Sequence, residues 1–128
     1  MNFSESLKKN EDFSRVYRFG RSKADKNIVL YALNNHTDRN HLGISVSKKV
    51  GNSVVRHHLA RLIREAYRLH EDEFHIGWDL VVVVRKGRDQ ISYHEVEHSL
   101  LFLADLLRVV HKGDKIEKGS IISDSSLS

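Results

Sequence analysis

The residues best placed to do chemistry are basic side chains spaced three or four positions apart within residues 48–68. On a helix of 3.6 residues per turn, four of them fall within about 60° of one another: His57, Arg61, Arg64 and Arg68. Like charges this close repel by about a few tenths of a kcal/mol per pair, and arginine suits bidentate contact with phosphate. A merely solvated face usually interleaves glutamates, and Glu65 is the only acid here. The pattern therefore favours binding of a polyanion.

The same segment carries an apolar stripe that predicts how the helix is held. Six side chains share an arc of about 120° and are expected to face a core: Val55, Leu59, Leu62, Ile63, Ala66 and Leu69. Arg56 and Tyr67 are expected to flank the basic face. Gly51-Asn52-Ser53 suits the cap of this helix, which we predict to end near Asp72.

A second motif, His94-Glu95-Val96-Glu97-His98, matches the HExxH pattern of zinc proteases and keeps a zinc metalloprotease open as a remote alternative. The two imidazoles share a helical face, but that face lies opposite Val96 and Leu100 and should point to solvent. Glu95 also fits a capping box with Ser92. Neighbouring His57 and His58 diverge by about 100° on a helix, so an acid–base pair acting on one phosphate is disfavoured.

Other segments predict the elements that position these residues, in the order helix, strands, helix, strand, helix. Asn10 is a good N-cap for a first helix that Gly20 closes. Periodicity and composition then predict three strands and a last helix: strands at Asn27–Leu33, His41–Ser47 and Trp78–Val84, and a helix from Ser92 to about Lys112-Gly113. Phe13 and Tyr17 share a face of the first helix among basic residues, which suits either core packing or stacking on unpaired bases.

Composition indicates one globular domain of 128 residues with a net charge of +4. There is no cysteine, which excludes disulfides and thiolate metal sites. No apolar run is long enough to span a membrane, and the N-terminus lacks the apolar core of a signal peptide, so a cytoplasmic location and no membrane partner are expected. We assign residues 1–113 to this domain and expect the polar tail 114–128 to be disordered.

At several separated segments the chain resembles the protein subunit of bacterial ribonuclease P, over roughly residues 7 to 110. The matching segments keep the family's order and spacing: LKKNEDFSRVYRFGRS, NIVLYAL, LGISVSKKVGNSVVRHHLARLIREAYR and WDLVVVVRKG. The family's central motif usually has Arg-Asn-Arg, an apolar residue and a basic residue before RLIR. Here His57, His58 and Ala60 replace three of those side chains, while Arg56 keeps the first.

The resemblance implies an α+β single-domain sandwich like that of a ribosomal protein, with an uncommon left-handed strand–helix–strand crossover. By matching position, it also implies contacts with the catalytic RNA from Lys48, Lys49, Asn52, Arg56, His57, Arg61, Arg64 and Arg68. A concave face lined by Phe13, Tyr17 and Tyr31 would hold the 5′ leader of precursor tRNA.

The resemblance further implies an endoribonuclease subunit, that is, part of a ribonucleoprotein hydrolase for tRNA processing, that has no catalytic or metal-ligating residue of its own. The RNA and its bound magnesium would carry out the hydrolysis, with one protein monomer per RNA. A ribosomal-type RNA-binding protein without enzymatic activity is the alternative, because it needs the same basic face and small core.

Overall fold

Strand β5 (Trp78–Val84) is the middle strand of a five-stranded sheet, and its predicted bounds are confirmed. The computed structural model describes residues 1–111. The strand order is β1-β4-β5-β3-β2, with β4 parallel to β1 and β5, and β3 antiparallel to β5 and β2. The other strands are β1 (Ser4–Ser6), β2 (Arg21–Ala24), β3 (Ile28–Asn34) and β4 (Asn40–Ser45).

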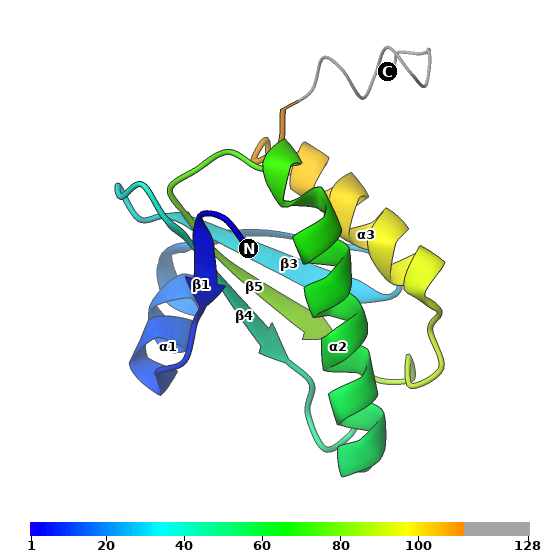
Figure 1. Cartoon of the computed structure of the whole chain (residues 1–128). Helices are drawn as coiled ribbons and strands as arrows, with labels where there is room; N and C mark the ends of the chain where they lie inside the picture. The colour runs from blue at the N-terminus through cyan, green and yellow to red at the C-terminus, as the bar shows by residue number, and fades with distance from the viewer. Residues whose placement is uncertain (112–128) are drawn as a thin grey trace.

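Three helices cover the two faces of this sheet (Figure 1). Helices α2 (Ser53–His70) and α3 (Tyr93–Leu106) lie on one face, and α1 (Asn10–Phe19) lies on the other. The chain is therefore a mixed α+β single domain, as the sequence predicted. The connection from β4 through α2 to the parallel strand β5 is the expected left-handed crossover (Figure 1).

Alternation along the strands divides the apolar side chains between two cores. Leu80 and Val82 of β5 join the larger core beneath α2 and α3. Val81, between them, joins a smaller core with Val16 of α1 and with Leu7. Because β5 buries both of its faces, its continuous apolar run needs no alternation with polar residues.

Several predicted boundaries are wrong. The N-cap of α1 is Lys9 rather than Asn10, and its side chain makes no capping bond. Helix α2 ends at His70 and is followed by the 3₁₀ turn Glu71–Glu73. Helix α3 ends at Leu106 rather than near residue 112, because Arg108 adopts a positive φ of 62° that stops the helix. The predicted tail 114–128 lies outside the described residues.

Strand β1, which the sequence analysis did not find, is held by a buried polar cluster. The buried carboxylate of Glu71 accepts hydrogen bonds from the backbone N–H groups of Asn2 (2.7 Å) and Phe3 (3.0 Å). The hydroxyls of Ser4 and Tyr67 lie 2.7 Å apart, and the Tyr67 hydroxyl also accepts from the side chain of Asn40. These contacts tie the N-terminus to the end of α2.

Residue His70 links the C-terminal end of α2 to α3 through two carboxylates. Its Nδ1 lies 2.7 Å from Glu73 Oε2 and its Nε2 lies 2.6 Å from Glu97 Oε2. Burial lowers the pKa of His70, but hydrogen bonds to Glu97 and Glu73 raise it more, so the net shift is above the usual 6.5. The imidazolium, with both nitrogens donating, is the form that the fold stabilises.

We predict that His70→Ala lowers the free energy of unfolding by about 1.5–3 kcal/mol at pH 6, the range for hydrogen bonds to charged groups. A histidine whose pKa is raised on folding contributes its full stabilisation of the folded state below the unfolded pKa, near 6.5. That contribution is lost as the pH rises through the folded pKa. The gap between wild type and variant should therefore shrink above that pH. Urea unfolding from pH 5.5 to 9 measures it, with His58→Ala as a control because that histidine is exposed on the same helix. A gap that does not change with pH would contradict the assignment.

Candidate nucleic-acid interface

The buried side of α2 is rotated by about 50° from the predicted stripe. Leu59, Ile63 and Ala66 are fully buried as expected, but Leu69 is 55% exposed and Tyr67, predicted to flank the basic face, is fully buried. Tyr67 is drawn inward because its ring packs on Phe74 at 4.9 Å between centroids, and its hydroxyl has partners in Ser4 and Asn40. The rotation leaves the opposite basic side facing solvent.

We call that outer side the α2 basic face, and it consists of His57, Arg61, Arg64 and Arg68, all exposed. Within residues 1–111, neither Arg61 nor Arg64 makes an ion pair. The exposed Lys48 and Lys49 precede the helix, and Asn52 caps it by accepting a hydrogen bond of 3.0 Å from the backbone N–H of Val55. The predicted cap is confirmed, so the side-chain oxygen of Asn52 has a partner within the protein.

Two of the predicted RNA-binding arginines are less free than the sequence suggested. Both side chains of the Arg68–Glu65 pair are about half exposed, with Nε–Oε1 at 3.0 Å and Nη2–Oε2 at 2.7 Å. An exposed ion pair of this kind contributes little stability, so another anion can replace the Glu65 carboxylate as the partner of Arg68. Arg56 lies seven residues before buried Ile63, on nearly the same side of the helix, and is half-buried for that reason.

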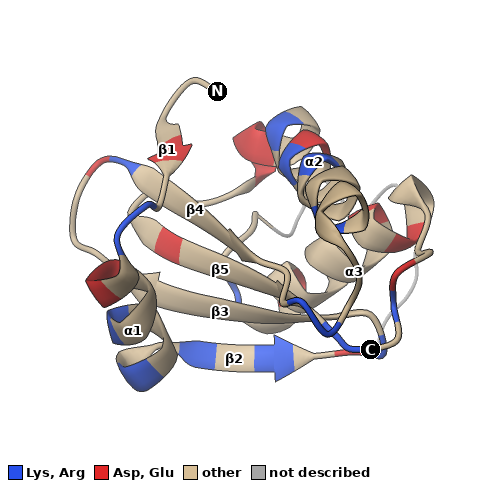
Figure 2. Cartoon of the chain, turned by 90° about the horizontal axis from the view of Figure 1, so that it is seen from below, with Lys and Arg blue, Asp and Glu red and all other residues tan. Residues whose placement is uncertain are grey.

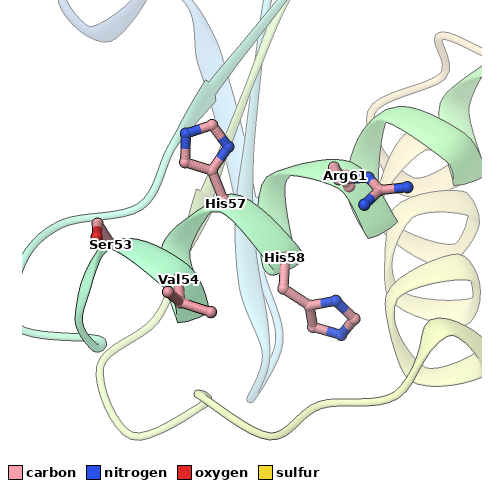
Figure 3. Close-up of a pocket in the computed structure, with 5 residues that line it drawn as sticks. All are labelled: Ser53, Val54, His57, His58 and Arg61. Carbon is pink, nitrogen blue, oxygen red and sulfur yellow. The ribbon is translucent and has the colours of Figure 1, made fainter.

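The first two turns of α2 border an open cavity of about 440 Å³ (Figure 3). It is lined by Ser53, Val54, His57, His58 and Arg61. His57 and His58 point in different directions from the helix (Figure 3), as expected for neighbours about 100° apart. They are therefore not directed at one shared ligand atom, and the cavity offers separate polar contacts beside Val54, an apolar side chain that is 76% exposed.

Figure 2 shows that Lys and Arg residues are concentrated on α1, β2 and α2. Strand β2, whose residues are all exposed, contributes Arg21 and Lys23 at the edge of the sheet. The sequence analysis did not find this strand, since RSKA has no apolar alternation. The positive charge thus surrounds both faces of the sheet and is not confined to α2.

The three aromatic residues predicted to line a cleft lie together, and we call them the aromatic row. The ring centroids of Tyr17 and Tyr31 are 5.0 Å apart at 73°, and those of Phe13 and Tyr17 are 6.4 Å apart at 51°. Phe13 and Tyr31 are half-buried against the smaller core, whereas Tyr17 is 40% exposed. The row therefore combines the two readings that the sequence left open, core packing on one side and an accessible ring surface on the other.

Residue Gly43 of β4 makes room for the aromatic row. A Cβ atom at this position would lie 2.7 Å from Cζ and 2.8 Å from Cε2 of Phe13, closer than van der Waals contact allows. Gly43 is paired with Val81 in the sheet, and Val81 is paired with Tyr31. The register thus places the glycine, the valine and the tyrosine in one line across the sheet, with Phe13 seated over the gap.

The HExxH motif does not form a metal centre. Glu95 accepts from the backbone N–H of Ser92 in a complete capping box, as predicted. His98 stacks on Phe102 at 6.0 Å, and His94 points to solvent. Among residues 1–111 no three His, Asp or Glu side chains are grouped to hold a metal ion. In the same part of the chain, no helix has the length and apolar character that crossing a membrane requires.

Comparisons with known proteins agree on one family. A family model described as Ribonuclease P matches residues 1–108. The chain is 47% identical over 111 residues to the ribonuclease P protein component of Lachnoclostridium phytofermentans, covering 87% of this chain and 96% of that protein. The corresponding protein of Alkaliphilus metalliredigens is 42% identical over 110 residues, covering 86% and 99%.

Solved structures give the same result for the fold. The RNase P protein of Staphylococcus aureus matches with a TM-score of 0.76 and 36% identity, over 83% of this chain and 97% of that chain. That of Thermotoga maritima matches with a TM-score of 0.70 and 29% identity, over 76% and 92%. Because the family model spans nearly all the described residues and the relatives match along nearly their whole length, this chain belongs to the ribonuclease P protein family.

Proposed function

We propose that the chain is the protein subunit of a ribonuclease P that removes the 5′ leader of precursor tRNA. The observation that carries the proposal is the presence of two different surfaces in one domain, the α2 basic face and the aromatic row. The α2 basic face suits a folded RNA, and the aromatic row suits an extended single strand. A ribosomal-type RNA-binding protein needs the first surface, whereas a leader-binding subunit needs both.

The α2 basic face would bind the catalytic RNA through its phosphates. Arg61 and Arg64 project from a helix whose other side is fixed in the core, so little backbone order has to be created on binding. Lys48 and Lys49 extend the positive surface before the helix, and Arg68 can join by exchanging Glu65 for a phosphate. His57 and His58 stand where the family usually has an amide and a guanidinium, and here they would supply ring contacts and hydrogen bonds.

The leader would lie along the aromatic row. Aromatic faces stack on unpaired bases of any sequence, at about 1–3 kcal/mol per base. Arg15 and Arg18 are exposed on α1, the helix that carries two of the rings, and would contact the leader phosphates where the strand leaves the row. This combination of rings and cations is the general means of holding a single strand extended.

Hydrolysis itself we assign to the RNA of the holoenzyme and its magnesium ions. The chain would supply positive charge that screens the repulsion between two polyanions, so that less magnesium is needed to bring them together. One protein per RNA, acting in the cytoplasm, is the simplest assembly consistent with this role.

Reconstitution tests the proposal. Mixing the full chain with a bacterial ribonuclease P RNA should stimulate leader removal at low magnesium by about tenfold or more over RNA alone, because screening replaces bound cations. The assay is cleavage of labelled precursor tRNA against magnesium concentration, with a basic protein of similar charge as the control. Equal activity with and without the chain would reject the proposal in favour of a protein that only binds RNA.

Charge reversal at Arg64 should weaken binding of the catalytic RNA about tenfold while leaving the thermal midpoint within about 2 °C, since the side chain is exposed and unpaired within residues 1–111. The slope of log K against log salt should also fall by about one to two, one phosphate contact being worth about 0.9. Lys26→Glu is the matched control, because exposed Lys26 lies between β2 and β3 and belongs to neither surface. An equal loss in both variants would point to net charge rather than to the α2 basic face.

Removing rings of the aromatic row should weaken only leader-dependent affinity. Phe13→Ala and Tyr17→Ala should each reduce holoenzyme affinity for precursor tRNA about 5- to 100-fold and leave affinity for mature tRNA unchanged, because base stacking is lost. Phe19→Ala is the control on the same helix, since that ring is exposed and lies outside the row. A loss of thermal stability with unchanged leader affinity would assign the row to core packing alone.

A further inference from the structure

Two histidines that belong to neither the α2 basic face nor the aromatic row are in contact with each other. The ring centroids of His75 and His111 are 4.1 Å apart, and the ring planes meet at 74°. His75 lies in the connection between the 3₁₀ turn and β5, and His111 lies in the segment that follows the end of α3 at Leu106. That segment runs beside the C-terminal end of α2 (Figure 1). We call the two residues the histidine pair.

The backbone at the histidine pair is held by a short antiparallel bridge between Phe74 and Val110. Both bridge residues are buried in the larger core. The N–H of His75 donates to the carbonyl of Val109 at 2.8 Å, and the N–H of His111 donates to a carbonyl of the opposite segment at the same distance. The two Cα positions are therefore set by the fold, whereas each ring can still turn about its side-chain torsions.

The separation of the rings is close to what one metal ion requires of two imidazoles. With a Zn–N bond of about 2.0–2.1 Å and a centroid about 1.1 Å beyond the nitrogen, two rings ligating at about 90–110° have centroids about 4.5–5.2 Å apart. The observed 4.1 Å is slightly shorter, and a small rotation of the exposed His111 ring supplies the difference. Burial, and then the neighbouring His111, lower the pKa of His75 below its usual 6.5, which favours the neutral imidazole that metals bind.

The type of ligand decides which metals suit the pair. Imidazole nitrogen suits zinc, copper and nickel, whereas magnesium takes oxygen ligands. Among residues 1–111 no three His, Asp or Glu side chains are grouped to hold a metal ion, so water would complete the coordination. A site with two protein ligands binds more weakly than a structural zinc site with four, and its ion would exchange readily.

We propose that the histidine pair binds one divalent late transition-metal ion and thereby clamps the segment after α3 to the connection that precedes β5. The bound ion joins two segments that the Phe74–Val110 bridge already brings together, so its coordination stabilises the folded chain. This site is separate from the magnesium assigned to the RNA, and it does not depend on the proposed leader or RNA contacts.

Zinc titration of the full chain tests the proposal, followed by the NMR signals of its nine histidine rings. The ring signals of His75 and His111 should shift together, before those of the other histidines, and saturate at one zinc per chain. Zinc at about ten times its Kd should raise the thermal midpoint by about 3 °C or more. Magnesium at the same concentration should produce neither effect, because it is a poor partner for imidazole.

Three single variants identify the ligands. His75→Ala and His111→Ala should each weaken zinc binding by about tenfold or more, because each removes one of two ligands. His94→Ala is the matched control, since it removes one histidine of the HExxH motif, the other pair on a shared face, and should leave zinc binding unchanged. Thermal unfolding without zinc checks that the variants fold, and the exposed position of His111 makes its variant the safer one.

The outcomes decide between a built site and adventitious binding. Zinc binding that is lost in both ligand variants and kept in His94→Ala supports the proposal. Zinc affinity that is unchanged in either ligand variant, or that falls equally in His94→Ala, overturns it and leaves adventitious binding to surface histidines only. Ring signals of His75 and His111 that shift independently of each other also overturn it.

Discussion

The burial of one side of α2 against the sheet is the constraint on which the rest of the structure depends. Leu59, Ile63 and Tyr67 are fully buried there, and each large side chain contributes about 1.5–3 kcal/mol. Repulsion among the outward arginines costs about a few tenths of a kcal/mol per pair. The packing term is the larger by several-fold, so the fold can hold cations together that would otherwise separate, and it presents them in one orientation.

Sequence patterns predicted the elements whose signals are local. The apolar run of β5, the Asn52 cap and the capping box of Ser92 with Glu95 were all found because each depends on residues within a few positions. Strands β1 and β2 were missed because short polar edge strands carry no apolar alternation and are defined by the neighbours that pair with them. The rotation of α2 escaped for a related reason: Tyr67 is turned inward by Ser4, Asn40 and Phe74, none of which periodicity can place.

In the candidate site, too, some residue positions follow from local sequence and others depend on tertiary contacts. The outward position of Arg61 and Arg64 follows from helical geometry alone, whereas the meeting of Phe13, Tyr17 and Tyr31 depends on strand register and on the missing Cβ of Gly43. Periodicity indicated a ring surface on α1 but could not predict that Tyr31 lies beside it. That prediction came from the family resemblance. Glu65, the only acid in residues 48–68, pairs with Arg68, because a side chain three residues earlier on a helix reaches its guanidinium easily. The pairing of His41 with Asp79 joins two strands and has no local signal.

The aromatic row and the α2 basic face are connected by a short, ordered path. Gly43, a residue of β4, lies under Phe13 of α1, and β4 ends at Ser45. Lys48, Lys49 and the capped start of α2 follow within a few residues. A sheet flanked by packed helices deforms little, so the distance and angle between the aromatic row and the α2 basic face are set by the fold. Under the proposed function, an RNA docked on one surface would find the leader already held in register on the other. The protein would then fix the relative position of the two nucleic acids, so that binding them would also position them.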